Sequence, residues 1–188
     1  MNFEILNGAA SDVAPRLLGC TIEREIDGHI LRAKIVETES YEQDDLASHS
    51  YRGVTERTKV MFGPPGALYV YFTYGMHYCC NVVVEPEGHG AAVLIRAVEP
   101  VDGIKIMQKN RGGRNGVDLT NGPAKFCQAF LIDKKLNNHD LNKLPLRLII
   151  NEPLPAFRIV TTTRIGISQA KDVPWRFYIK DNPYVSKY

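Results

Sequence analysis

Residues 67–84, Ala-Leu-Tyr-Val-Tyr-Phe-Thr-Tyr-Gly-Met-His-Tyr-Cys-Cys-Asn-Val-Val-Val, contain two runs of aromatic and β-branched residues that meet at Tyr74-Gly75. Such runs are typical of β-strands, and a glycine supplies the positive φ that a tight turn requires. The stretch therefore predicts a β-hairpin with strands over Ala67–Thr73 and His77–Val84 and with Tyr74 at its tip.

Further strand signals lie on both sides of this hairpin. Before it, two β-type runs flank Asp27-Gly28, which is a strong signal for a two-residue hairpin turn. After it, an apolar run follows Gly88-His89-Gly90, and shorter β-type runs stand near the C-terminus. The strands expected outside the first hairpin are Thr21–Ile26, His29–Thr38, Ala91–Val98, Leu146–Ile150, Arg158–Thr162 and Arg176–Ile179.

Helical signals are fewer and shorter. We expect helices over Ser11–Leu18, with Ser11 as N-cap, over Asp102–Asn110, and over Pro123–Ile132, with Asn121 as N-cap.

Consecutive hairpins with a few helices predict a mixed architecture. Residues 42–65 are too irregular for a regular element, and no repeat or linker divides the chain. We expect one α+β domain over residues 1–188, a curved, open-barrel-like antiparallel sheet with peripheral helices and a protruding hairpin at 67–84.

Composition excludes several classes of protein. The 188 residues are 44% hydrophobic and 23% charged, and 23 Lys+Arg against 21 Asp+Glu give a net charge of +2. These values exclude collagen, coiled coil and low-complexity disorder. No apolar run reaches the roughly 18 residues of a membrane span, and the N-terminus does not resemble a secretory signal. We expect a cytoplasmic protein, and the near-neutral charge alone favours a small-molecule enzyme over a nucleic-acid binder.

Neither the cysteines nor the acids have the spacing of a metal site. The four cysteines, Cys20, Cys79, Cys80 and Cys127, are expected to be reduced, mostly buried thiols. Five acids fall between Glu37 and Asp45 with His49 nearby, but their spacing matches neither a calcium loop nor a zinc motif. We expect no metal.

Residues 33–41, Ala-Lys-Ile-Val-Glu-Thr-Glu-Ser-Tyr, place two carboxylates in a largely apolar strand. Strict alternation puts the odd-numbered residues Ala33, Ile35, Glu37, Glu39 and Tyr41 on one face. A glutamate desolvated there is suited to general acid–base catalysis. The alternative is a strand end that emerges into solvent.

Two other positions need a partner. A tyrosine at a hairpin tip, such as Tyr74, either folds back over its sheet, contacts a partner, or enters a stack of bases as a wedge. Arg96, inside an apolar run, needs an anion or acceptors if it is buried, and a salt bridge would place it beside Glu37 or Glu39.

Basic residues gather away from the acidic segment. They are Lys105, Lys109, Arg111, Arg114, Arg164, Lys171, Arg176 and Lys180. This pattern is typical of either a phosphate-binding face or an ordinary solvated face.

A series of short motifs runs in order through nearly the whole chain: Leu17-Leu18-Gly19, Ile35-Val36-Glu37-Thr38-Glu39-Ser40-Tyr41, His49-Ser50, Met61-Phe62, Pro65-Gly66-Ala67-Leu68-Tyr69-Val70-Tyr71, Tyr74-Gly75-Met76, Asn81, Leu94-Ile95-Arg96-Ala97-Val98-Glu99-Pro100, Asn121-Gly122-Pro123-Ala124-Lys125, Arg164-Ile165-Gly166 and Arg176-Phe177-Tyr178. Together they resemble the alkyladenine DNA glycosylases, also called 3-methyladenine or methylpurine DNA glycosylases.

The resemblance implies a monofunctional DNA glycosylase of base-excision repair that needs no cofactor and no metal. Such an enzyme hydrolyses the N-glycosidic bond of an alkylated or deaminated purine that has been flipped out of duplex DNA. The implied lesions are of the 3-methyladenine, hypoxanthine and ethenoadenine class.

The resemblance also implies catalytic roles. Glu39 matches the general base that activates water, Arg96 matches a residue that positions that water or Glu39, and the backbone of Ile165 helps to position the water. Glu37 is expected to be structural.

The remaining matches concern the base and the DNA. Tyr41, His49 and Tyr71 match the walls between which the flipped base stacks, and Asn81 matches a pocket-floor residue that crowds the amino group of guanine. Tyr74 matches the intercalating residue. Lys125 and Arg164 are expected DNA contacts.

The expected partner is damaged double-stranded DNA, bound by a monomer in a bacterial type of cytoplasm, with no membrane association. Two alternatives remain open at this stage. One is a nucleic-acid-binding module without catalysis, and the other is a metal-dependent hydrolase built on the acids and His49.

Overall fold

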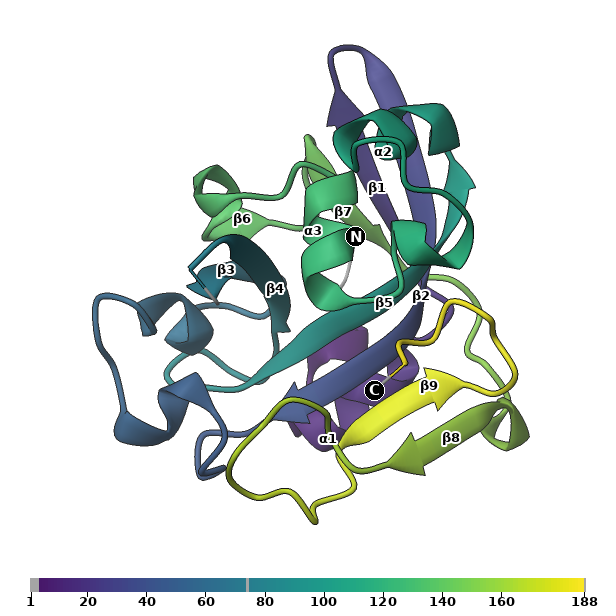
Figure 1. Cartoon of the computed structure of the whole chain (residues 1–188). Helices are drawn as coiled ribbons and strands as arrows, with labels where there is room; N and C mark the ends of the chain where they lie inside the picture. The colour runs from purple at the N-terminus through teal and green to yellow at the C-terminus, as the bar shows by residue number, and fades with distance from the viewer. Residues whose placement is uncertain (1–3, 74, 188) are drawn as a thin grey trace.

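The computed structural model of the chain describes residues 4–73 and 75–187, and it confirms the α+β architecture (Figure 1). The described residues form one curved antiparallel sheet and three helices of seven residues each, α1 (Ala10–Arg16), α2 (Ile104–Asn110) and α3 (Pro123–Ala129). The strands are β1 (Thr21–Ile26), β2 (His29–Tyr41), β3 (Ala67–Thr73), β4 (His77–Val83), β5 (Ala92–Asp102), β6 (His139–Asp140), β7 (Leu146–Ile149), β8 (Ile159–Thr162) and β9 (Arg176–Ile179).

Strand β2 is the centre of the sheet. The strand order is β6-β3-β4-β5-β2-β1-β7, and β9, with β8 beside it, pairs with the far end of β2. The first half of β2 thus pairs with β1 and the last part, Glu37–Glu39, with β9, while β5 runs along the other edge of β2 (Figure 1). Residues at the end of β2 are therefore enclosed by strands on both sides.

The two predicted hairpins are confirmed. Asp27 and Gly28 join β1 to β2 with positive φ angles of 49° and 75°, as a two-residue turn of the favoured hairpin type requires. Gly75, between β3 and β4, has a φ of 68°. Phe72 and Met76 are 51% and 71% exposed, so this hairpin protrudes at its end. Tyr74 lies outside the described residues.

The helices form where expected, but neither predicted N-cap is correct. The residues at the cap positions are Ala9 and Gly122, without a side-chain cap bond. Ser11 lies inside α1, where its N–H donates to Glu42, and Asn121 accepts instead from Lys125 Nζ. The N–H of Ser11 thus bonds to a residue far away in the sequence, which cap rules based on local sequence do not consider, whereas the bond from Lys125 to Asn121 is local.

A register shift at Val36 overturns the prediction that Ala33, Ile35, Glu37 and Glu39 share a face. Ile35 pairs with Val98, whereas Glu37 pairs with the adjacent Ala97. Neighbours on β5 point to opposite faces, so their partners Ile35 and Glu37 do too. Strict alternation does not predict this change, because the extra residue in β2, Val36, reverses the face to which the side chains after it point.

This shift separates the core from the polar residues of β2. Ile35 and Val36 both pack in the main hydrophobic core, and Thr38 donates to Ala14 O of α1. In Figure 1, α1 is drawn behind β2 and α3 in front of β5. The four cysteines are free and buried, as predicted.

Candidate active site

A row of paired residues crosses five strands and sets the floor of the site. Tyr69 pairs with Asn81, Asn81 with Leu94, Leu94 with Glu39, and Glu39 with Arg176. Directly paired residues share a face of a sheet. The pairing therefore brings together residues from β2, β3, β4, β5 and β9 that are far apart in the sequence.

A cavity of about 580 Å³ opens over this floor. Its wall includes seven residues that the sequence analysis assigned to the site, namely Tyr41, His49, Tyr71, Asn81, Arg96, Lys125 and Ile165. The cavity is also lined by Cys79, Leu94 and the segment Gly166–Gln169, none of which the sequence predicted as a site residue. Cys79 could have been found, because it stands two residues before Asn81 on a strand and so shares its face.

Glu39 lies fully buried beneath this cavity and is held from three sides. Its Oε1 accepts the N–H of Ile165 at 2.8 Å and lies 3.2 Å from Arg96 Nη1. Its Oε2 accepts the hydroxyl of Tyr41 at 2.8 Å. Each of these three partners lines the cavity, so Glu39 is close to the cavity and yet fixed in direction.

Arg96 contacts both glutamates of β2. Its Nε donates to Glu37 Oε1 at 3.2 Å, its Nη1 faces Glu39, and Nη1 also lies 3.4 Å from Ile165 O. A second register shift explains the geometry: Ala97 pairs with Glu37 and Ile95 with Thr38, so Arg96 has no partner opposite it. Such bulges redirect a side chain.

The charges in this cluster favour a fixed protonation pattern. Burial alone would lower the pKa of Arg96, but the adjacent carboxylates of Glu39 and Glu37 outweigh burial and raise it. Burial and then Glu39 raise the pKa of Tyr41 well above its usual value. Tyr41 therefore stays protonated at neutral pH and donates to Glu39.

The aromatic wall is a packed group of three rings. The rings of Tyr69 and Tyr71 stack at 5.3 Å, and His49 meets the Tyr71 ring edge-on at 4.7 Å. His49 Nδ1 lies 3.0 Å from the Tyr69 hydroxyl. The His49 side chain is partly exposed to solvent. Even so, desolvation of its ring, and then the cation of Arg57, lower the pKa of His49 to about 4. The ring is neutral at neutral pH.

Asn81 carries an unsatisfied acceptor. The residue is 4% exposed, and its Oδ1 has no hydrogen-bond partner among the described residues. Buried polar atoms without a partner are rare and need an explanation. Nearby, burial raises the pKa of Cys79 to about 12, so this wall residue is a neutral thiol.

Arg164 does not fit the expected role of a DNA contact. Its side chain is buried, pairs with the buried Asp45, and donates from Nη1 to Ser40 O at 2.9 Å. Its guanidinium also lies over the rings of Tyr41 and Trp175. Asp45, the last acid of the segment Glu37–Asp45, pairs with Arg164 inside the protein. Arg164 therefore supports the cavity wall from behind.

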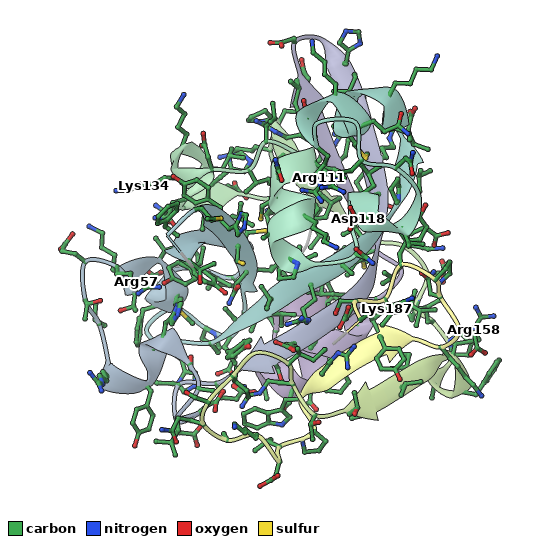
Figure 2. All side chains as sticks on the ribbon, viewed as in Figure 1. Arg57, Arg111, Asp118, Lys134, Arg158 and Lys187 are labelled. Carbon is green, nitrogen blue, oxygen red and sulfur yellow. The ribbon has the colours of Figure 1, made fainter. Side chains whose placement is uncertain are left out.

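The other basic residues are only partly available to phosphates. Arg111 is tied to Asp118 and to the carbonyl of Leu119, and the two labelled side chains lie beside α3 in Figure 2. Arg176 is buried with Glu37. Lys125 remains partly exposed at the cavity rim, where Nζ contacts Asp118 at 2.7 Å. The basic set is therefore not one uniform surface.

The donors around the cavity do not suit a metal ion. Arginines engage Glu37, Glu39 and Asp45, while His49 is shared between the Tyr69 hydroxyl and the cation of Arg57. Within residues 4–73 and 75–187, one group with metal-ligand geometry stands apart from the cavity wall: Glu42, Glu85 and His89.

The fold and the site together define an enzyme with a buried carboxylate, that of Glu39, beneath an aromatic-walled cavity. The family model for methylpurine-DNA glycosylase (MPG) matches residues 4–183. The chain belongs to the methylpurine-DNA glycosylase family and is a DNA glycosylase, an enzyme that hydrolyses the N-glycosidic bond of damaged DNA.

Relatives from three bacteria are similar over almost their full length, and each carries the name "Putative 3-methyladenine DNA glycosylase". The protein of Carboxydothermus hydrogenoformans is 57% identical over 93% of this chain and 92% of its own. Those of Francisella tularensis and Nitrosospira multiformis are 48% and 45% identical, over 97% and 96% of this chain and 96% and 91% of their own. In the described part of the chain, no helix has the length and apolar character to span a membrane.

Proposed function

We propose that this DNA glycosylase excises alkylated and deaminated purines of the 3-methyladenine, hypoxanthine and ethenoadenine class. The purine is flipped out of the duplex into the cavity, and Glu39 activates a water that attacks C1′ as the base leaves. The observation that carries the proposal is the Glu39 carboxylate, buried beneath the cavity and held by three of its wall residues.

The hydrogen bonds of Glu39 support a place for the water. A carboxylate offers about two acceptor sites on each oxygen. Two nitrogens, from Ile165 and Arg96, approach Oε1, whereas Oε2 receives, from the residues that the structure describes, only the Tyr41 hydroxyl. We assign the water to the remaining site on Oε2, and we propose that the Ile165 carbonyl, which lies 3.4 Å from Arg96 Nη1, helps to orient it.

The walls suit an electron-poor or cationic purine. Tyr41 and Tyr71 present aromatic rings to the cavity, and His49 is uncharged. A methylated purine that carries positive charge gains from aromatic faces and would be repelled by a charged imidazolium. The free energy of binding in the cavity is therefore more favourable for a cationic lesion than for a normal base.

Asn81 is the proposed selectivity residue at the floor. Its side chain crowds the amino group of an undamaged guanine, and its free Oδ1 accepts from those lesions that carry a donor, such as the amino group of 3-methyladenine. A lesion without a donor leaves this acceptor unsatisfied, so we expect Asn81 to affect preference among the lesions as well.

Further parts of the proposal concern DNA binding. Residues 1–188 act as one domain and as a monomer, in the cytoplasm at the nucleoid. Tyr74 enters the stack at the flipped base, where the exposed ends of β3 and β4 bring the hairpin to the surface. Lys125 is retained as a DNA contact at the cavity rim, and Arg164 is not.

A panel of duplexes, each with one damaged purine, tests this function. We expect release of 3-methyladenine and of at least one deaminated or etheno base, unaffected by EDTA, and no protein–DNA adduct on addition of borohydride. Loss of activity with EDTA would support the metal-dependent hydrolase, and a trapped adduct would support a lysine nucleophile. Binding of lesion DNA without base release would support the non-catalytic module.

A further inference from the structure

We infer that Ser186 and Glu37 are positioning residues that hold Arg96, and through Arg96 the Glu39 carboxylate, in the reactive arrangement. Neither residue lines the cavity, so neither touches the base. The inference rests on the proposed function of Glu39 as the base that activates water. It concerns how the C-terminal segment contributes to that reaction.

Glu37 is a fully buried carboxylate that four donors engage. Its Oε1 accepts from Arg96 Nε at 3.2 Å, from Arg176 Nε at 2.6 Å and from Ser186 Oγ at 2.9 Å, and its Oε2 accepts from Ser186 N at 2.7 Å. Among the residues that the structure describes, Arg96, Arg176, Glu37 and Glu39 thus form a cluster with no net charge. A carboxylate without such partners is very costly to bury.

The hydroxyl of Ser186 forms hydrogen bonds with both Arg96 and Glu37. It accepts from Arg96 Nη2 at 3.4 Å and donates to Glu37 Oε1 at 2.9 Å. Arg96 therefore has Nε held by Glu37 and Nη2 held by Ser186. Because a guanidinium is planar and rigid, fixing these two nitrogens also fixes the direction of the third. That third nitrogen, Nη1, is the one that faces Glu39 and the Ile165 carbonyl.

The segment that supplies Ser186 is itself anchored. It follows β9, and Figure 1 shows this yellow segment looping back toward β9 and β2. Asn182 Nδ2 donates to Glu99 Oε2 at 3.0 Å, and Asn182 Oδ1 accepts from Tyr184 N at 2.9 Å. The hydroxyl is therefore held in place before substrate arrives, as preorganised catalysis requires.

A purely structural role would look different from a positioning role. If the cluster only stabilised the fold, loss of the Ser186 hydroxyl would lower Tm and leave the chemistry of the folded enzyme unchanged. If it positions Arg96, the same loss slows base release in folded enzyme and leaves lesion binding intact. In a variant without Arg96, loss of the Ser186 hydroxyl must then no longer slow base release.

The experiment compares the parent with Ser186→Ala, Arg96→Ala and the double variant, each in the full chain. For each protein, the measured quantity is the single-turnover rate constant for release of the base that the parent excises best in the lesion panel. Dissociation constants for the same duplex and Tm are measured alongside. We expect Ser186→Ala to slow release about tenfold, with the dissociation constant within about threefold of the parent. In the Arg96→Ala background, the same change should alter the rate by less than about twofold.

The matched control is Thr38→Val. Thr38 lies between the two glutamates on β2, is equally buried, and donates its hydroxyl to Ala14 O on the opposite face. This variant loses a buried hydroxyl without touching Arg96, so Tm should fall while the rate stays within about twofold of the parent.

The outcomes separate this inference from the proposed function. A normal rate for Ser186→Ala, or an equal loss with and without Arg96, overturns the positioning role while leaving the function of Glu39 intact. Full activity of Glu39→Gln, measured in parallel, would overturn the proposed function and this inference together.

Discussion

Tyr41 joins the wall of the cavity to the carboxylate beneath it. Its ring lines the cavity, and its hydroxyl is the one donor to Glu39 Oε2 among the described residues. The phenol stays protonated because burial and Glu39 raise its pKa. The two functions of the residue, a stacking surface and a hydrogen bond, belong to different atoms and are therefore separable.

Tyr41→Phe separates them. The ring remains, so we expect affinity for a lesion duplex to change by less than about threefold, whereas single-turnover base release should slow by about tenfold because Glu39 loses one of its three partners. Rates and dissociation constants for the same duplex check this. A matched loss of affinity, with release from the bound complex unchanged, would assign the hydroxyl to binding instead.

At this scale the sequence identified seven of the 21 described residues that line the cavity, among them those nearest to Glu39. The motifs identified Glu39, Tyr41 and Asn81, and the burial of Arg96 in an apolar run predicted its salt bridge to a glutamate. The roles of Asp45, Arg176 and Ser186 were missed, because each depends on a partner far away in the sequence. Arg164 was misjudged for the same reason, since nothing near it in the chain indicates Asp45.

The elements were predicted well where the signal is local. Asp27-Gly28 and Gly75 fixed the two hairpins, and the helix spans are close to those expected. The two-residue strand β6 was missed because His139-Asp140 has no β pattern of its own. The shifts at Val36 and Arg96 were missed because a bulge depends on the pairing of two strands.

The end of β2 also carries a pH-dependent contact between elements. Glu42 is buried, accepts from Ser11 N of α1 at 2.9 Å, and interacts with Glu85. Burial, together with Glu85, raises the pKa of Glu42 from 4.5 to about 7. Because the folded state holds this proton more tightly than the unfolded state, the contribution of Glu42 to stability falls as pH rises from about 4.5 to about 7.

Glu42→Gln should remove this decline. The amide keeps the acceptor for Ser11 and donates to Glu85, so we expect a Tm roughly 2–6 °C above the parent at alkaline pH and little difference below pH 4.5. Thermal unfolding across pH measures it. Asp44→Asn, at an exposed neighbouring acid, serves as control. Parallel curves for Glu42→Gln and the parent would show that Glu42 does not carry the effect.

At the scale of the whole molecule, the net charge of +2 hides an uneven distribution. Glu37, Glu39 and Asp45 are neutralised inside by Arg96, Arg164 and Arg176. These buried pairs cancel, and the net charge does not tell how the other charged residues are placed, so net charge alone favoured the wrong class of protein.

This distribution predicts weak binding to undamaged DNA. We expect a dissociation constant of about 1 µM or weaker at about 0.15 M KCl, tightening steeply as salt is lowered. A titration of undamaged and lesion duplexes across KCl concentrations checks it. Affinity for undamaged duplex that is tight and insensitive to salt would contradict the view that lesion capture depends on the cavity.

The central claim is that the buried Glu39 carboxylate activates the water that releases the base. Glu39→Gln keeps the shape of the side chain and removes the base, and single-turnover release from a lesion duplex measures the effect directly. We predict release slowed by at least about a thousandfold, with the lesion duplex still bound at near-parental affinity. Release within about tenfold of the parental rate, from equally folded protein, would contradict the account.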